Sequence, residues 1–221
     1  MRKEETADDQ LRAIIVCDYF IASNLTEFDL DRLNEPQSFH AAIYEYFKDK
    51  LGEDKLGEDR KSIWNHLKKY NPIYQRGCPF TIRSHSIHPA KKGGTFARKG
   101  ISKNTVIESL SGTLFPLSSQ QVQEFERAGE CINIVRSHLG QRNFYLAGPA
   151  QFVQHDCRPN AELMRAGQSC LAHVVARREI ATGEEIVIDY GQNYFDSIDI
   201  AERSCGCRSC QANGNKLPFF A

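Results

Sequence analysis

The stretch Phe152-Val153-Gln154-His155-Asp156-Cys157-Arg158-Pro159-Asn160 says more about the fold than any other part of the chain. Two further segments follow it: Gly183-Glu184-Glu185-Ile186-Val187-Ile188-Asp189-Tyr190-Gly191, and then Cys205-Gly206-Cys207-Arg208-Ser209-Cys210. Each segment alone is only suggestive. Their order and spacing carry the predictions of fold and function made below.

The composition is that of an ordinary soluble protein. With 221 residues, 41% hydrophobic and 25% charged, the chain can bury a substantial core as one domain, with or without a helical appendage. The 28 basic and 28 acidic residues balance, so net charge predicts neither DNA binding nor membrane attraction. No apolar run approaches the roughly 20 residues of a membrane span, and no signal-peptide core follows Met1. We therefore expect an intracellular protein whose partners must be inferred from a site.

The eight cysteines favour a metal site over a disulfide framework, because three of them fall between Cys205 and Cys210. Structural zinc usually takes four ligands, so Cys205, Cys207 and Cys210 need a distant fourth. Cys157 is the best candidate, since it lies inside the first decisive stretch. The remaining cysteines are expected to be packed free thiols: Cys17, Cys78, Cys131 and Cys170.

Residues 1–77 are expected to form a helical region. The segment 11–22 is ambiguous between helix and strand, whereas 38–47 has a serine N-cap and the apolar spacing of an amphipathic helix. The near-tandem repeat at 51–60 predicts a solvated loop. A further helix over 60–70 should end at Asn71-Pro72, because the residue before proline avoids helical angles.

From about Cys78 onward the sequence predicts short strands and turns. Ser118 or Ser119 can cap a short helix through Phe125, which Gly129 would end. The expected strands are 80–83, 94–98, 106–114, 171–176 and 186–188, with a turn at 181–184 before the last. The absence of βαβ alternation argues against the doubly wound methyltransferase fold.

From about Gly93 to Cys210 the sequence resembles the SET domain of the histone H4 lysine 20 methyltransferases, in particular the fungal branch. The segments that carry the resemblance are Ile107–Gly112, Leu146–Phe152, His155–Asn160 and Ile186–Phe195, and the Leu-x-Gly-Pro-Ala run singles out this branch. It implies an α+β fold: an N-terminal helical region (1–77), a mostly-β SET domain with a pseudoknot (78–200), and a zinc-binding post-SET tail (201–221).

The resemblance also implies S-adenosylmethionine as cofactor. Gln154 and His155 would contact its adenine end, and backbone of the turn at 92–95, with Gly93 and Gly94, would approach its methionine end. Tyr190 and Phe195 complete the predicted cofactor-binding set. Phe144, Tyr145 and Phe195 are read first as core residues and second as lining of the channel or pocket.

Tyr190 is the predicted catalytic residue. A lysine side chain has a pKa of about 10.4, so methyl transfer requires a site that favours the neutral amine and aligns its lone pair. A narrow apolar channel disfavours the ammonium, and the tyrosine hydroxyl can orient the amine without acting as a full base. Ile188 stands where related enzymes often carry Phe or Tyr. An aliphatic residue there holds no water, which predicts room for a second and a third methyl group.

The resemblance gives the predicted zinc site of Cys157, Cys205, Cys207 and Cys210 a second role, because the ion would attach the tail to the active site. Phe219 or Phe220 could then cover the adenine, or could serve as a simple hydrophobic anchor. The segment around 155–160 would thread beneath a loop near Tyr190 to form the pseudoknot, an exceptional arrangement among folds.

One departure from the family bears on activity: Gln154 stands where asparagine is usual, and a longer side chain can displace a cofactor contact. A second departure, Ala161 in place of a frequent cysteine, changes little. The leading interpretation is a nuclear, chromatin-associated methyltransferase that di- or trimethylates lysine 20 of histone H4. The alternatives are a catalytically weak chromatin-binding scaffold, and an enzyme for another histone lysine or a non-histone or ribosomal lysine.

The expected partners follow from the leading interpretation. They are the histone H4 tail and the nucleosome, with Glu184, Glu185 and Asp189 as candidates for meeting the substrate's positive charge. We expect a monomer with no membrane association and no direct sequence-specific contact with nucleic acid.

Overall fold

A computed structural model of the chain describes residues 11, 14, 15, 17, 18, 21, 65, 66, 68–74, 77–84, 93–128, 133–136, 142–167, 169–191 and 207–212. Several predictions fall elsewhere in the chain. These are the helix over 38–47, the loop at 51–60, and residues Cys131, Phe195, Cys205, Phe219 and Phe220.

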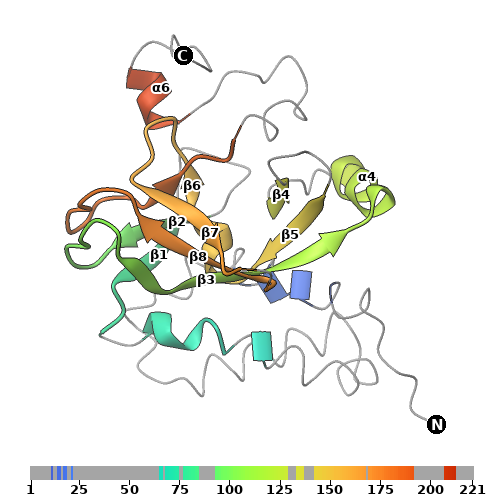
Figure 1. Cartoon of the computed structure of the whole chain (residues 1–221), viewed down its shortest axis with the longest axis horizontal. Coiled ribbons are helices and arrows are strands. Elements are labelled where there is room, and N and C mark those ends of the chain that lie inside the picture. Colours follow the sequence, from blue (N-terminus) through green and yellow to red (C-terminus); the bar gives the residue numbers. More distant parts are fainter. Residues whose placement is uncertain are drawn as a thin grey trace.

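An antiparallel sheet of five strands forms the centre of the molecule, in the order β4-β5-β3-β8-β7 (Figure 1). The long strand β3 occupies its middle and pairs with both β5 and β8. The strands are β3 (Val106–Leu117), β4 (Ile134–Arg136), β5 (Asn143–Ala147), β7 (Ala161–Arg165) and β8 (Leu171–Ala176).

Among the described residues, two smaller strand pairs and several short helices accompany this sheet. Strands β1 (Phe80–Ser84) and β2 (Gly93–Ala97) pair antiparallel, whereas β6 (Gln154–His155) and β9 (Val187–Ile188) pair parallel. The helices are η1 (Asn71–Tyr74), α4 (Ser119–Ala128), η3 (Pro149–Phe152) and α6 (Arg208–Ala212). None of the helices in the described part of the chain is long and apolar enough to cross a membrane.

The prediction of a mostly-β fold with short strands is confirmed. Strand β8 has the predicted bounds, and α4 begins after Ser118, whose hydroxyl accepts the Gln121 amide at 3.2 Å. In return, the Gln121 side-chain oxygen accepts a hydrogen bond from the Ser118 amide at 2.8 Å, which completes a capping box. The described residues of the ambiguous segment, such as Leu11 and Ile14, are helical.

Three expectations need correction. The turn expected at 92–95 is the start of β2, where Gly93 and Gly94 pair with Ser84 and Arg83. The helix expected over 60–70 gives way to a turn by residue 68, and η1 then continues across Pro72. Strand β7 was not predicted, because Ala-Glu-Leu-Met-Arg lacks the β-branched and aromatic residues that mark a strand.

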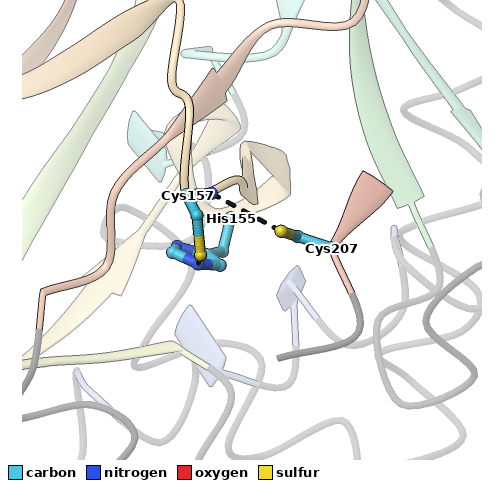
Figure 2. A group of neighbouring side chains, drawn as sticks. All are labelled: His155, Cys157 and Cys207. Carbon is cyan, nitrogen blue, oxygen red and sulfur yellow. Dashed lines mark hydrogen bonds between the residues drawn. The ribbon is translucent and has the colours of Figure 1, made fainter. Parts of the chain in front are cut away.

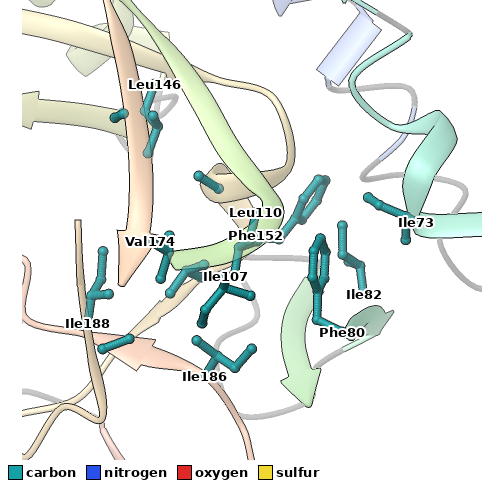
Figure 3. Packing of buried hydrophobic residues seen from close by; sticks show 14 of the residues in the cluster. Ile73, Phe80, Ile82, Ile107, Leu110, Leu146, Phe152, Val174, Ile186 and Ile188 are labelled. Atoms are coloured by element: carbon teal, nitrogen blue, oxygen red, sulfur yellow. The ribbon is translucent and has the colours of Figure 1, made fainter. Parts of the chain in front are cut away.

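The main core cluster packs residues of the central sheet against β1, η3 and β9 (Figure 3). In β8 the residues Ala172, Val174 and Ala176 are buried, while the alternating positions face outward, as the two-residue period of a strand requires. The same cluster contains Phe80 of β1, Phe152 of η3 and Ile188 of β9. Elements that carry the decisive motifs therefore share one hydrophobic core.

The Leu-x-Gly-Pro-Ala run has a clear structural reason. Gly148 has φ of 98°, a conformation that L side chains rarely adopt, and Pro149 follows in the first turn of η3. Opposite them, a Cβ on Gly112 would lie 2.8 Å from the carbonyl oxygen of Ala147. The two glycines let β3 and β5 approach closely, so that η3 starts directly beneath the sheet.

A buried polar network joins the N-terminal helical residues to η3. Asp18, 1% exposed, accepts hydrogen bonds from His66 Nε2 and from the Tyr70 hydroxyl, both at 2.6 Å, and from the Gly148 amide at 3.3 Å. Gln151 Nε2 in turn donates to the Tyr70 hydroxyl at 2.9 Å. Burial, and secondarily the charge of Asp18, raise the pKa of Tyr70 well above its usual range. The carboxylate thus satisfies several buried donors at once.

We expect Asp18→Ala to lower the free energy of unfolding by about 3–5 kcal/mol, because it leaves buried donors without an acceptor. Urea denaturation followed by far-UV circular dichroism measures the change. Glu124→Ala, on the exposed side of α4, is the matched carboxylate control and should stay within about 0.5 kcal/mol. An Asp18 effect as small as that of the control would contradict the network's role.

Candidate active site

The parallel pair β6–β9 brings the two distant motifs together. Gln154 lies opposite Val187 and His155 opposite Ile188, and the Asp156 amide continues the ladder to the Ile188 carbonyl at 3.0 Å. Parallel pairing requires a long connection between the strands, here β7 and β8. The two motifs, which are far apart in the sequence, are therefore in direct contact.

Asn160 holds this arrangement from the side. Its Nδ2 donates to the Glu185 carbonyl at 2.7 Å and to Glu184 Oε1 at 3.0 Å, and its Oδ1 accepts the Val187 amide at 2.9 Å. The side chain is buried at 1% exposure. Asn160 therefore fixes the segment 184–187, which leads to Tyr190, against the end of the decisive stretch. We call these three hydrogen bonds the Asn160 clamp.

Glu184 and Glu185 have partners within the protein. Burial alone would raise the pKa of Glu184, but hydrogen bonds from Arg178, the Ala181 amide and Asn160, with the charge of Arg178, lower it from 4.5 to about 2. Glu185 is 8% exposed, and its Oε2 lies 3.3 Å from Arg208. Both carboxylates therefore stabilise the local fold, and their role as contacts for a basic substrate stays a prediction.

Tyr190 is held at three points. Its hydroxyl donates to the Val153 carbonyl at 2.7 Å, and its amide donates to His155 Nδ1 at 3.2 Å. The rings of the two residues also touch, with centroids 5.4 Å apart. Because the hydroxyl proton is engaged by Val153, the oxygen can meet a further partner only as an acceptor.

Gln154 has a specific partner. Its side-chain amide donates to the carbonyl of Gly93, and it lies 3.5 Å from the carbonyl of Phe152. The longer side chain therefore bridges β6 to the first residue of β2. Close by in sequence, the hydroxyl of Thr95 is fully buried and has no hydrogen-bond partner within the described residues.

The predicted channel residues divide between site and core. Ile188 is 4% exposed in the main core cluster, and Tyr190 packs against that cluster. Tyr145 stacks on Phe125 of α4 at 6.1 Å in a second cluster, and Phe144 lies beneath the guanidinium of Arg165. Phe144 and Tyr145 thus take the core position that was their first interpretation.

The sulfurs of Cys157 and Cys207 lie beside His155 (Figure 2), and the sulfur of Cys210 lies next to that of Cys157. The sulfurs of Cys157 and Cys210 are 3.5 Å apart, and the ligand atoms of His155, Cys157 and Cys207 lie within 4.8 Å of one another. The Cys207 sulfur accepts the amides of Cys157 at 3.5 Å and of Cys210 at 3.4 Å. Three of the four predicted ligands are therefore brought together.

This donor set suits zinc. Thiolates bound to one tetrahedral zinc at about 2.3 Å lie a little under 4 Å apart, which is compatible with these separations. Backbone amides directed at Cys207 favour its thiolate form. Cys207 and Cys210 are 1% and 2% exposed, so both side chains are shielded from solvent.

Polar contacts also fasten the tail helix α6 to the site. Asp156 Oδ2 accepts the Ser209 amide at 3.2 Å, while its Oδ1 accepts the Arg158 amide at 2.7 Å. The pair of Arg208 with Glu185 adds a second link. One residue of the decisive stretch, Asp156, therefore orients both its own turn and the tail.

The site contains functional residues that the sequence analysis did not assign. Asn160 and Asp156 were quoted within the motif but given no role, and Val153 was not singled out. Their presence in the distinctive stretch was the available signal. Their roles were not predictable, because each depends on a partner more than 20 positions away, at Glu185, Ser209 or Tyr190.

Comparison with known proteins agrees with this geometry. A family model described as "SET domain" matches residues 32–191. "Histone-lysine N-methyltransferase set9" of Aspergillus terreus is 35% identical over 161 residues, covering 71% of this chain and 25% of that protein. The protein of the same name from Aspergillus fumigatus is 30% identical over 210 residues, covering 92% of this chain and 31% of that protein. The chain thus spans less than a third of the length of these curated relatives.

The matched range contains every strand of the central sheet, the β6–β9 pair and Tyr190. It therefore covers most of the chain and the whole arrangement of motifs around which the site is built. The mostly-β topology, the family match and the relatives lead to one conclusion: this chain belongs to the SET-domain family.

Proposed function

We propose that this chain is the catalytic part of an S-adenosylmethionine-dependent protein-lysine methyltransferase that acts on lysine 20 of histone H4 in chromatin. The observation that carries the proposal is the placement of Tyr190, whose hydroxyl is held at 2.7 Å by Val153 and whose main chain is held by His155. The relatives named histone-lysine N-methyltransferase support the substrate class.

The residues around β2 and β6 suit the proposed cofactor. Gly93 and Gly94 are buried and carry no side chain, the Gln154 amide anchors the Gly93 carbonyl, and the buried Thr95 hydroxyl has hydrogen-bonding capacity to spare. We assign Gly93, Gly94, Gln154, His155 and Tyr190 to this pocket, with Phe195 as a further member. When bound, S-adenosylmethionine supplies the electrophilic sulfonium methyl group.

The protein's own contribution is to orient and desolvate the lysine amine. The half-buried Tyr190 can accept a hydrogen bond from the amine, because its own proton is already engaged by Val153. The buried apolar surroundings, which include Ile188, disfavour the charged ammonium form. Fixing the lone pair in this way lowers the entropic part of the barrier.

The test is methyl transfer from labelled S-adenosylmethionine to recombinant nucleosomes carrying native H4, compared with nucleosomes carrying H4 with lysine 20 replaced by alanine. We expect label on the native histone and loss of nearly all label on the altered one. Label retained on the altered histone would move the target to another lysine. Cofactor binding without transfer to any histone would favour the scaffold interpretation, for which Gln154 remains the motivating feature.

Ile188 should permit more than one methyl group on the product. We expect native protein with excess cofactor to form di- and trimethyllysine, and Ile188→Tyr to shift the product toward monomethyllysine by at least about tenfold, because its hydroxyl can hold a water in the channel. Intact mass spectrometry of H4 over time measures the distribution. Ile188→Phe is the matched control for bulk without a hydroxyl. Monomethyl product alone from the native protein would contradict this assignment.

A further inference from the structure

The ring of His155 contacts both the Cys157 sulfur and Tyr190. Nε2 is 3.4 Å from the Cys157 sulfur (Figure 2). Nδ1 is 3.2 Å from the Tyr190 amide nitrogen. The side chain is 6% exposed, so these contacts largely replace solvent. The ring is therefore positioned either to bind a metal through Nε2 or to connect the sulfurs with Tyr190.

The contact at Nδ1 decides between the two roles. The Tyr190 amide can only donate, so Nδ1 must be the acceptor, and a neutral imidazole then carries its proton on Nε2. The opposite tautomer would place two N–H groups against each other. The carboxylate oxygen Asp189 Oδ1 lies 3.6 Å from Nδ1 and already accepts the Gly191 amide at 2.9 Å.

A protonated Nε2 cannot ligate zinc, but it can donate to a thiolate. The Cys157 sulfur lies 3.4 Å from Nε2. The same sulfur is 3.5 Å from the Cys210 sulfur, as expected for two ligands of one ion. Hydrogen bonds from donors outside the ligand shell orient metal ligands, and losing one typically costs about 10–100-fold in affinity or activity.

We propose that His155 is a positioning residue: its imidazole, protonated at Nε2, links the Cys157 thiolate to the main chain and ring of Tyr190, and it is not a metal ligand. Assembly of the cysteine site would then set the orientation of Tyr190 directly. The kinetic part of this inference rests on the proposed function, whereas the tautomer and ligand assignments do not.

The experiment uses the full chain loaded with zinc. X-ray absorption at the zinc edge should show a first shell of sulfur alone, both in native protein and in His155→Ala. In His155→Ala, kcat for methyl transfer to nucleosomes should fall about 10–100-fold with little change in KM for the nucleosome. Nitrogen NMR of labelled histidine should report the Nε2-protonated tautomer in native protein. His173→Ala, on the outer side of β8, is the matched control and should change none of these values.

Two conservative variants separate the two contacts. His155→Gln can place an amide nitrogen near the position of Nε2, so zinc affinity should stay near the native value while kcat falls. His155→Asn can place an oxygen near the position of Nδ1 but has no donor for the sulfur, so zinc affinity should fall by about 10–100-fold. Competition with a chromogenic chelator measures the affinities.

Several results would overturn the proposal. A nitrogen ligand that is present in native protein and lost in His155→Ala would make His155 a ligand. An Nδ1-protonated tautomer, or native kcat and zinc affinity in His155→Ala, would remove the link. If native protein transfers no methyl group, the proposed function fails by itself, and the X-ray absorption, NMR and affinity measurements still decide the role of His155.

Discussion

Tyr190→Phe should lower kcat for methyl transfer to nucleosomes by about 100- to 1,000-fold, while KM for the nucleosome changes little. The hydroxyl of Tyr190 donates to the Val153 carbonyl at 2.7 Å, so its position is fixed before substrate arrives. Phenylalanine retains the ring contact with His155 but cannot orient an amine. The loss corresponds to about 3–4 kcal/mol of activation free energy.

Steady-state kinetics with labelled cofactor measures this effect. Tyr145→Phe is the matched control, because Tyr145 lies in the second core cluster, where its hydroxyl is 3.5 Å from Asn133 Nδ2. Thermal unfolding of both variants should remain close to native, which separates catalysis from stability. Native kcat in Tyr190→Phe would show that the hydroxyl takes no part in the reaction.

Cys207→Ser should abolish both stoichiometric zinc and methyl transfer. The Cys207 sulfur accepts two backbone amides and lies among the other proposed ligand atoms, so a serine oxygen would be a poor replacement for a thiolate. Structural zinc sites contribute about 10–16 kcal/mol of binding free energy, which far exceeds what the contacts of a short helix such as α6 supply. Without the ion, the tail should detach from Asp156 and Glu185.

Zinc content by mass spectrometry and methyl transfer are measured on the same preparation. Cys170→Ser is the matched control, because Cys170, which was expected to be packed, is an exposed free thiol just before β8. It should retain native zinc and native activity. Full activity in Cys207→Ser without bound metal would refute a role for the ion in assembling the site.

Acid pH should have no comparably large effect on the active site, because Glu184, whose pKa is lowered, lies in the turn before β9. Its pKa falls from 4.5 to about 2, so its stabilising contacts are complete above pH 4.5 and are lost only as the pH falls toward 2. Titration of Glu184 should therefore not affect methyl transfer near neutral pH.

Local sequence predicted the elements whose cause is local. Strand β8 follows from strict alternation of small and branched apolar residues, and α4 from a serine cap with its returning glutamine. The pair Gly93-Gly94 predicted a turn, because glycine pairs favour turns, and this prediction was wrong. Here the partner strand β1 holds them in a strand, and a side chain 61 positions away donates to the Gly93 carbonyl.

By itself, the sequence determined the family resemblance and the mostly-β class, and it predicted Tyr190, His155 and the cysteines as site residues, because all of these depend on residue types at fixed spacing. Only the tertiary structure decided how they act together. The Asn160 clamp, the Asp18 network and the tautomer of His155 each depend on hydrogen bonds between distant segments. Such bonds are directional and short in range, so sequence spacing cannot specify them until the fold has brought donor and acceptor together.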